Sequence, residues 1–396
     1  MHICVISDIL GDYIGGAESS TALWIKELLK RGYKITVFTT VKKVKTLDKH
    51  ENLKVVNFKG IGLKQFFGLK KRANIYLPLN LLDTLKILRI IKTVDIVYVS
   101  IPTILSFITM QIAKILNKPV VTHHHIHAEV IYHNFNFPFG LEKFKIFYYK
   151  VLINFYNSSD MLISPSKHEL NILKKLGLKT ASTIISNGID IDKFQHANSK
   201  IFLNKYKINR SSKKILFVGR LNRDKNVELL IKASKAIINN YENLTFIIIG
   251  EGIERKKLER LVKELNLSKY FLFTGFVPSS ILLSAYGAAD IFVLPSFSET
   301  QGIVLLEASA SGKPLIGGDN SAVKEIVING YNGYTFKTNN YQDLANKIIK
   351  ILHNKILLKT FSANSIKLAK NHDINKSMDI LVNIFQDLRN KNELKN

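Results

Sequence analysis

The sequence predicts an α/β protein with two doubly wound parallel sheets, each in a domain of its own. Short apolar segments rich in Ile and Val alternate with helix-length amphipathic segments, and this alternation restarts near residue 214. Such alternation is typical of a parallel sheet covered by helices. In addition, a chain of 396 residues is too long for one compact core. We therefore expect two Rossmann-like domains.

The elements follow in order along the chain. The strands expected in the first half are His2–Ser7, Lys34–Thr39, Leu53–Phe58, Ile96–Val99, Pro119–Thr122 and Met161–Ile163. Those expected in the second half are Lys214–Val218, Thr245–Ile249, Tyr270–Thr274, Ile291–Leu294 and Pro314–Gly317. Helices are expected between them, for example over Ala17–Arg31, Leu81–Lys92, Asn226–Asn239 and Ile253–Leu265.

Composition excludes several classes of protein. The single cysteine, Cys4, rules out a disulfide framework within the chain and fits a reducing compartment. The first residues form a strand without a leader-like basic and apolar run, and no apolar stretch approaches the length of a membrane span. We expect a cytoplasmic protein, soluble or peripheral on the inner face of the cell membrane. The net charge of +26 comes without a nucleic-acid motif, so no nucleic-acid partner is expected.

The most informative run is Ser298–Pro314, where a loop turns into a helix. Glu299 lies in the loop, Gly302 at the turn and Glu307 inside the helix. Free amides at a helix start suit a phosphate, and a glycine lets the ligand approach closely. The two carboxylates would repel a bare phosphate, whereas sugar hydroxyls can donate to them. The run therefore favours a sugar–diphosphate–ribose ligand.

This run resembles the signature of retaining glycosyltransferases of family 4, whose two glutamates have seven residues between them, as here. The resemblance implies the GT-B fold, with two Rossmann-like domains that face each other across a cleft. It also implies that Glu299 binds hydroxyls of the donor sugar and that Glu307 binds the ribose diol. The other donor-binding positions it implies are Thr300, Gln301, Gly302, Ile303, Val304 and, after an earlier strand, Val277.

A second motif follows the strand that ends at Val218. Arg220 offers a bidentate fork and Lys225 a mobile point charge, and fixed cations can stabilise a departing diphosphate without a metal. The arrangement resembles the family's Gly-Arg…Lys motif, which implies phosphate contacts and a catalytic role for both. Asn226 stands where many members have glycine. No Asp-x-Asp segment is present, so we expect no cofactor and no divalent metal.

Two motifs in the first half complete the expected site. Gly15-Gly16 precedes a helix, and the resemblance places Gly16 against the donor phosphate. The segment Thr122–His127 holds four histidines. A polar loop and a metal site are alternatives there, but the family's Thr-x-His pattern selects His124 as the catalytic histidine beside the donor sugar. A shift in register would select His123 or His125 instead.

The family's Asn-Gly-Ile-Asp segment, matched from Asn187, sets the expected domain division. We expect an acceptor-binding domain over residues 1–193, a donor-binding domain over 194–374 and a terminal helix over 375–396 that packs back on the first domain. In this arrangement a hexose passes from a nucleoside diphosphate sugar, with a UDP-sugar favoured, to an acceptor hydroxyl.

The class of acceptor is predicted from one sequence motif and from two runs of aromatic and basic residues. Ser-Glu-Thr-Gln-Gly-Ile is similar to the motif in members that glucosylate diacylglycerol. The runs Leu63–Arg72 and Phe137–Lys150 mix aromatic and basic residues, which suits an anionic membrane surface. A membrane lipid or glycolipid is therefore the expected acceptor. The alternatives are a polysaccharide or glycoprotein glycan acceptor, a nucleotide-sugar epimerase of the same fold, and a basic surface-binding protein without catalysis.

Overall fold

The computed structural model divides the chain into two compact units. It describes residues 1–8, 10, 15–41, 44, 47–62, 74–76, 81–128, 131–132, 140–241 and 243–394. The first unit comprises Met1–Ser186 and Asn375–Asn396, and the second comprises Asn187–Ile374. Within the described ranges, no helix combines the length and the apolar character needed to cross a bilayer.

The first unit is built on a seven-stranded parallel sheet, ordered β3-β2-β1-β6-β7-β8-β9. Its strands are β1 His2–Ile6, β2 Lys34–Thr39, β3 Leu53–Asn57, β6 Ile96–Val99, β7 Val120–His123, β8 Met161–Ser164 and β9 Ser182–Ile184. The central strand β1 is fully buried from Ile3 onward, Cys4 included. A small antiparallel pair, β4 Gly60–Gly62 with β5 Asn74–Tyr76, lies outside this sheet.

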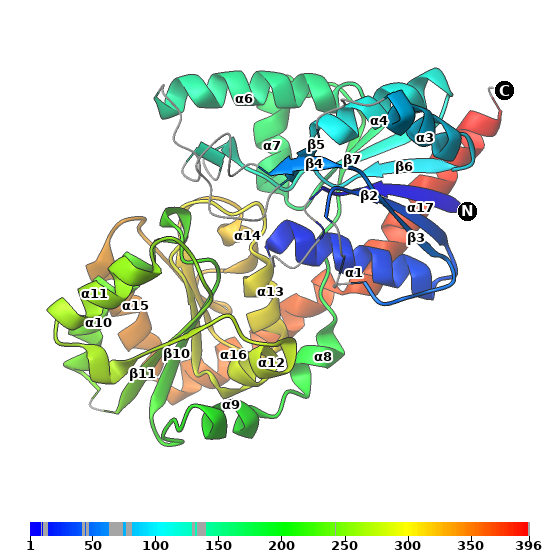
Figure 1. The fold of residues 1–396 in the computed structure, drawn as a ribbon. Coiled ribbons are helices and arrows are strands. Elements are labelled where there is room, and N and C mark those ends of the chain that lie inside the picture. The colour runs from blue at the N-terminus through cyan, green and yellow to red at the C-terminus, as the bar shows by residue number, and fades with distance from the viewer. Residues whose placement is uncertain are drawn as a thin grey trace. The chain divides into compact units, whose positions relative to one another are not determined.

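Helices cover both faces of this sheet. Figure 1 shows α3 Leu81–Lys92, α4 Ile104–Ile115 and α6 Leu141–Tyr156 on one side, and α1 Gly16–Lys30 and α17 Ile374–Glu393 on the other. On the second side, Trp24 of α1 and Phe385 of α17 both pack against Tyr98 of β6. The end of the chain therefore completes the core of the first unit. Helix α7, Lys167–Lys175, connects β8 to β9.

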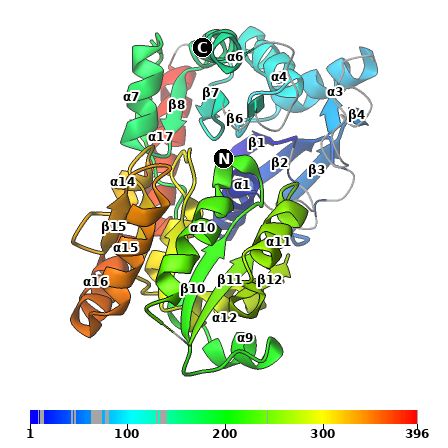
Figure 2. The ribbon, with the colours of Figure 1, turned by 90° about the vertical axis from the view of Figure 1, so that its left-hand side faces the viewer.

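The second unit repeats this plan with six parallel strands, ordered β12-β11-β10-β13-β14-β15 (Figure 2). Its strands are β10 Lys213–Val218, β11 Leu244–Ile249, β12 Phe271–Gly275, β13 Ile291–Leu294, β14 Leu315–Gly318 and β15 Gly333–Phe336. Its helices are α8 Ile191–Gln195, α9 Ser199–Lys205, α10 Val227–Ile238, α11 Arg255–Glu264, α12 Ser279–Ala288, α13 Ile303–Ala310, α14 Val323–Ile326, α15 Tyr341–Leu352 and α16 Lys355–Ala369. The central strands β10 and β13 hold the loops that carry the expected donor residues.

The two Rossmann-like sheets confirm the predicted fold class. The structure places the division at Asn187, a few residues before the expected one at 193, because Asn187–Phe194 is fastened to the second unit. There the Ile189 N–H donates to the His372 carbonyl (2.8 Å) and the Ile374 N–H donates to the Ile189 carbonyl (3.1 Å). Two aromatic and basic runs supported the membrane prediction. The first, Leu63–Arg72, lies outside the described residues, and so does the start of the second, up to Phe139.

Candidate functional site

The expected donor residues of the second unit gather at one edge of its sheet. Loops that leave the neighbouring strands β10 and β13 emerge side by side, since parallel strands end at the same edge. The two loops are also bonded to each other: the Phe297 N–H and the Ser296 hydroxyl both donate to the Asp224 carbonyl, at 2.9 and 3.0 Å. This fixes Lys225 of one loop against Glu299 of the other.

Lys225 and Glu299 form the central ion pair of this edge. The Lys225 Nζ lies 2.6 Å from Glu299 Oε1, and both side chains are about 12–13% exposed. A second carboxylate, the buried Asp224, lies 3.5 Å from the same ammonium. The structure thus brings together a predicted cation and a predicted sugar-binding carboxylate that are 74 residues apart in sequence.

Arg220 lies at the same edge, two residues beyond β10. Its side chain is partly exposed and has no hydrogen-bond or ion-pair partner among the residues that the structure describes. An unpaired guanidinium next to a fixed Lys–Glu pair is well suited to an incoming anion. Asn226 takes the left-handed conformation (φ 50°) that a glycine would favour there, so the loop keeps its turn without the glycine.

The start of α13 supplies backbone donors. Gly302 precedes the helix with φ 83°, and a Cβ at this position would come within 3.0 Å of the Leu305 side chain. Glycine is therefore required on conformational and steric grounds. The amides of Ile303 and Val304 follow in the first turn of α13, where no intrahelical acceptor exists for them. They form the amide pair expected to meet a phosphate.

Glu307 projects from the second turn of α13 and bonds to a residue that sequence reasoning missed. The Tyr286 hydroxyl donates to Glu307 Oε2 at 2.6 Å. Burial raises the pKa of Glu307 to about 7, while the Tyr286 hydroxyl and the charge of Lys193 oppose the rise. The second carboxylate oxygen stays available for a ligand hydroxyl.

The remaining predicted donor residues differ in accessibility. Thr300 is partly exposed, and Val277, just beyond β12, is 4% exposed. The Gln301 side chain is buried: its Oε1 accepts from the Asn187 amide (3.0 Å) and from Asn187 Nδ2 (2.8 Å). Gln301 therefore ties the Asn-Gly turn to the donor loop, a contact with no signal in the sequence.

In the first unit, Gly16 is exposed at the start of α1, and the histidines separate into two groups. His124 is fully buried with both ring nitrogens engaged: Nδ1 with the Tyr156 hydroxyl (3.0 Å) and Nε2 with Glu169 Oε2 (3.1 Å). His127 approaches the other Glu169 oxygen at 3.3 Å. Burial lowers the pKa of His124 to about 4, so the ring is neutral and donates to the carboxylate.

His123 and His125 form the second group, on the opposite side of the strand. The His123 ring is fully buried, 4.7 Å from Trp24, and its Nδ1 bonds to the Tyr98 hydroxyl at 2.7 Å. His125 stacks on His123 at 3.8 Å and is partly exposed. Its Nε2 has no hydrogen-bond partner within the described part of the chain. Burial and the neighbouring His124 lower the pKa of His125 to about 3.

A metal site at these histidines has no support in the geometry. Among the residues described, no three His, Cys, Asp or Glu side chains lie where they could share a metal ion. The expected independence from metals stays a prediction.

Two family models match the chain. The model for Glycosyltransferase Family 4 matches residues 14–193, and the model for Glycosyl transferases group 1 matches residues 198–368. The chain is a glycosyltransferase with a family 4 domain followed by a group 1 domain. The matches meet near the division between the two units, and together they account for both Rossmann-like sheets. The predicted family and the prediction of a hexosyltransferase are thereby confirmed.

Relatives and solved structures agree with this assignment. The alpha-monoglucosyldiacylglycerol synthase of Streptococcus pneumoniae is 25% identical over 359 residues, 89% of this chain and 78% of the relative. The processive diacylglycerol alpha-glucosyltransferase of Acholeplasma laidlawii is 26% identical over 307 residues, 75% of this chain and 86% of the relative. The crystal structure of HepE from Anabaena with UDP and glucose superposes with a TM-score of 0.78 at 21% identity, covering 98% of this chain and 100% of that one. This likeness establishes the GT-B fold of the glycosyltransferase.

Proposed function

We propose that this glycosyltransferase moves a hexose, with retention of configuration, from a UDP-sugar to a hydroxyl of a membrane lipid or glycolipid. The observation that carries the proposal is the donor edge of the second unit. There the unpaired Arg220 and the Lys225–Glu299 pair share one edge with the free amides of α13. Cations and helix amides together suit a diphosphate, and the carboxylates suit the hydroxyls at its two ends.

The chemistry follows from these groups. As the bond from the anomeric carbon to the diphosphate oxygen breaks, its electron pair leaves with the diphosphate. Arg220, Lys225 and the α13 amides stabilise the charge that develops there. The acceptor oxygen bonds to the same face of the anomeric carbon, and its proton passes to a departing phosphate oxygen. Glu299 orients the sugar and Glu307 the ribose.

Within the histidine segment, we assign the contact with the donor sugar to His125 in place of His124. His124 is enclosed, and Tyr156 and Glu169 occupy both of its ring nitrogens. His125 is partly exposed as a residue, and its Nε2, itself a buried atom, has no hydrogen-bond partner in the described structure. Its low pKa keeps the ring neutral, so Nε2 can take part in a hydrogen bond with a sugar hydroxyl.

A lipid acceptor is supported by one face of the first unit. The α3–α4–α6 face is defined by nine exposed apolar side chains: Leu81, Leu82, Leu85, Ile104, Phe107, Ile115, Ile146, Phe147 and Val151. Exposed cations lie among them: Lys86, Arg89, Lys92, Lys114, Lys143 and Lys150. Along the described lengths of α1 and α17, which cover the opposite face, Ile380 is the one exposed large apolar side chain. Apolar groups among cations suit an anionic bilayer surface.

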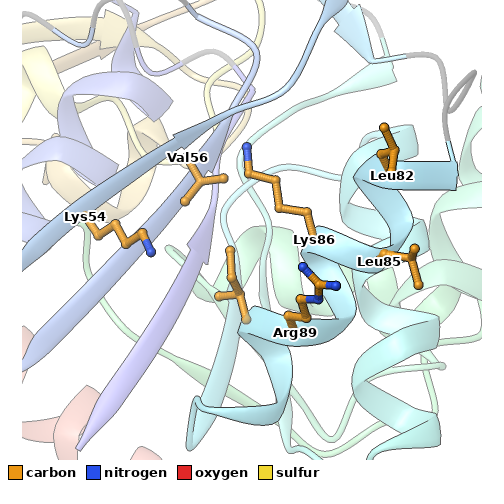
Figure 3. A pocket seen from close by; sticks show the side chains of 7 residues that line it. Lys54, Val56, Leu82, Leu85, Lys86 and Arg89 are labelled. Atoms are coloured by element: carbon orange, nitrogen blue, oxygen red, sulfur yellow. The ribbon is translucent and has the colours of Figure 1, made fainter.

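A hollow at one margin of this face also supports a lipid acceptor. Figure 3 shows side chains of β3 and α3 around it. Its lining residues are Lys54, Val56, Leu82, Leu85, Lys86, Arg89 and Ile90. Three cations together with apolar side chains can hold an anionic headgroup and the start of an acyl chain. The names of the two relatives, both of which act on diacylglycerol lipids, support the same acceptor class.

The function is tested by transfer from UDP-glucose to diacylglycerol in anionic vesicles. We expect UDP release and an α-linked glucolipid, identified by mass spectrometry and by the anomeric coupling constant in proton NMR. A β-linked product would contradict retention. Conversion of the nucleotide sugar to its epimer without an acceptor would identify an epimerase instead.

The role of Glu299 is tested in the same assay. We expect Glu299→Ala to lower turnover by roughly a hundredfold or more, as loss of a fixed polar contact to the reacting group does. The matched control is Glu259→Ala, which removes a glutamate of the same unit that pairs with Arg255 on the exposed side of α11. Near-full activity of Glu299→Ala would reject its assigned role.

A further inference from the structure

Asp8 is a buried carboxylate just beyond the central strand of the first unit. Its side chain is 4% exposed, and neither carboxylate oxygen has a hydrogen-bond partner among the residues that the structure describes. It also takes part in no ion pair within the same ranges. A buried polar group normally finds a partner, and a lone carboxylate is costly to bury. Within the described residues, the Asp8 carboxylate can therefore accept hydrogen bonds from a ligand.

The position of Asp8 also suits a ligand. It follows β1, which lies between β2 and β6 at the middle of a parallel sheet, so it stands at the carboxyl edge where doubly wound sheets bind ligands. The groups beside it are polar and uncharged. The Thr40 hydroxyl donates to the Asp8 carbonyl (3.3 Å), and the buried Ser7 hydroxyl likewise has no partner in the described structure.

Burial also changes the titration of Asp8. Burial raises the pKa of Asp8 to about 6, and the nearby Thr103 hydroxyl opposes the rise. The carboxyl is therefore mostly ionised at neutral pH, and an ionised carboxylate can accept more hydrogen bonds than the Thr103 hydroxyl alone supplies. A residue that made only internal contacts would not be left in this state.

We propose that Asp8 binds the acceptor of the reaction, with its two carboxylate oxygens accepting hydrogen bonds from hydroxyl groups of the polyol part of that acceptor. The proposal rests on the proposed function, because it takes the first unit as the acceptor side. A carboxylate matches such a ligand since each oxygen accepts an O–H donor, and Ser7 adds a further hydroxyl beside it. Hydroxyls of the bound acceptor donate to these oxygens, which lowers the free-energy cost of burying the carboxylate.

The experiment compares Asp8→Asn with Asp95→Asn in the full-length enzyme. Asp95 is the matched control, because it precedes β6 at the opposite edge of the same sheet and accepts from the His2 amide at 2.7 Å. Initial rates are measured with UDP-glucose and with monoglucosyldiacylglycerol in anionic vesicles, because the sugar headgroup of this glycolipid acceptor carries several hydroxyls. Thermal midpoints are measured without substrates at pH 7.5.

We expect Asp8→Asn to raise the KM for the lipid acceptor at least tenfold, with the KM for UDP-glucose unchanged. Its thermal midpoint should equal or exceed that of the wild type, since a buried unpaired charge is removed. Asp95→Asn should lower the midpoint and leave the acceptor KM unchanged.

An unchanged acceptor KM for Asp8→Asn would overturn the proposal, and so would a midpoint lowered as in Asp95→Asn, because either result makes Asp8 a structural residue. The proposed function is judged separately, by whether the wild type transfers glucose at all. The comparison of midpoints does not depend on turnover, so Asp8 is tested even if the function proves different.

Discussion

Glu307 carries the clearest pH dependence at the scale of single residues. Its pKa is raised to about 7, and the ribose hydroxyls of the donor are expected to donate to its ionised form. About one carboxyl in eleven is ionised at pH 6 and about ten in eleven at pH 8. Affinity for UDP-glucose should therefore strengthen roughly tenfold between these values, measured by calorimetry. Glu307→Gln should bind more weakly and lose this slope; an unchanged slope in that variant would assign the titration to another group.

The histidines provide a second prediction, because His124 and His125 differ in their hydrogen-bond partners. His125→Ala should lower turnover by roughly a hundredfold with little change in stability, since its Nε2 has no partner to lose within the described structure. His124→Ala should instead lower the free energy of unfolding by on the order of 3 kcal/mol, because it strips Glu169, which is 1% exposed, of a partner. Urea unfolding and initial rates of both variants separate the two effects. The reverse pattern would restore His124 as the residue that contacts the sugar.

The sequence identified individual residues where a motif is local. Glu299, Gly302 and Glu307 lie within one short run, and their spacing alone predicted a loop that turns into a helix. Their partners could not be found in this way. Tyr286 and Lys225 approach these glutamates only because separate strands end at the same edge of the sheet. For a related reason, the sequence could not select one histidine of the segment. Burial distinguishes His124 from His125, and burial depends on which face of β7 each side chain takes.

At the scale of elements, strands buried on both faces were predicted well. The bounds of β2, β6 and β13 agree with expectation, because β6 and β13 are continuous apolar runs and β2 is buried from its second residue onward. The sequence missed the antiparallel pair β4 and β5 and, within the two parallel sheets, β9 and β15. Strand β9 has three residues, begins with two polar ones and is only partly buried. Strand β15 begins with Gly333, where an added Cβ would collide with the Leu315 carbonyl of β14. Such strands are defined by their neighbours in the sheet, which no local pattern reveals.

The α3–α4–α6 face gives a prediction at the same scale. Leu82 and Phe147 are 68% and 62% exposed on helices α3 and α6. Replacing both with serine should weaken binding to anionic vesicles at least tenfold, because apolar area that would enter the bilayer interface is lost. Vesicle sedimentation measures the change, and the thermal midpoint should stay close to that of the wild type.

The matched control for that prediction is Ile356→Ser. Ile356 is 75% exposed on α16 of the second unit, outside the proposed membrane face. It should bind vesicles as the wild type does. Equal binding by the double serine variant and the wild type would contradict a membrane role for the α3–α4–α6 face.

At the scale of the whole molecule, the chain passes between its two units twice. It leaves the first unit after Ser186 and returns to it at Asn375, and α17 then buries Met378, Leu381 and Phe385 in the first unit. The sequence predicted this return only through family resemblance, since an amphipathic helix does not specify which sheet it covers. Each unit has its own sheet and core, which is why the fold class followed from strand and helix alternation alone.

The return of α17 has a consequence for biosynthesis. A ribosome that has made the first 186 residues has synthesised every strand of the first sheet, but it has not yet synthesised α17, the helix that covers part of one face. Tyr98 cannot make its ring contact with Phe385 until Phe385 has been synthesised, after the entire second unit. Released chains that end at residue 374 should therefore hold a protease-sensitive first unit and a resistant second one, reversing the usual order in which domains mature during translation.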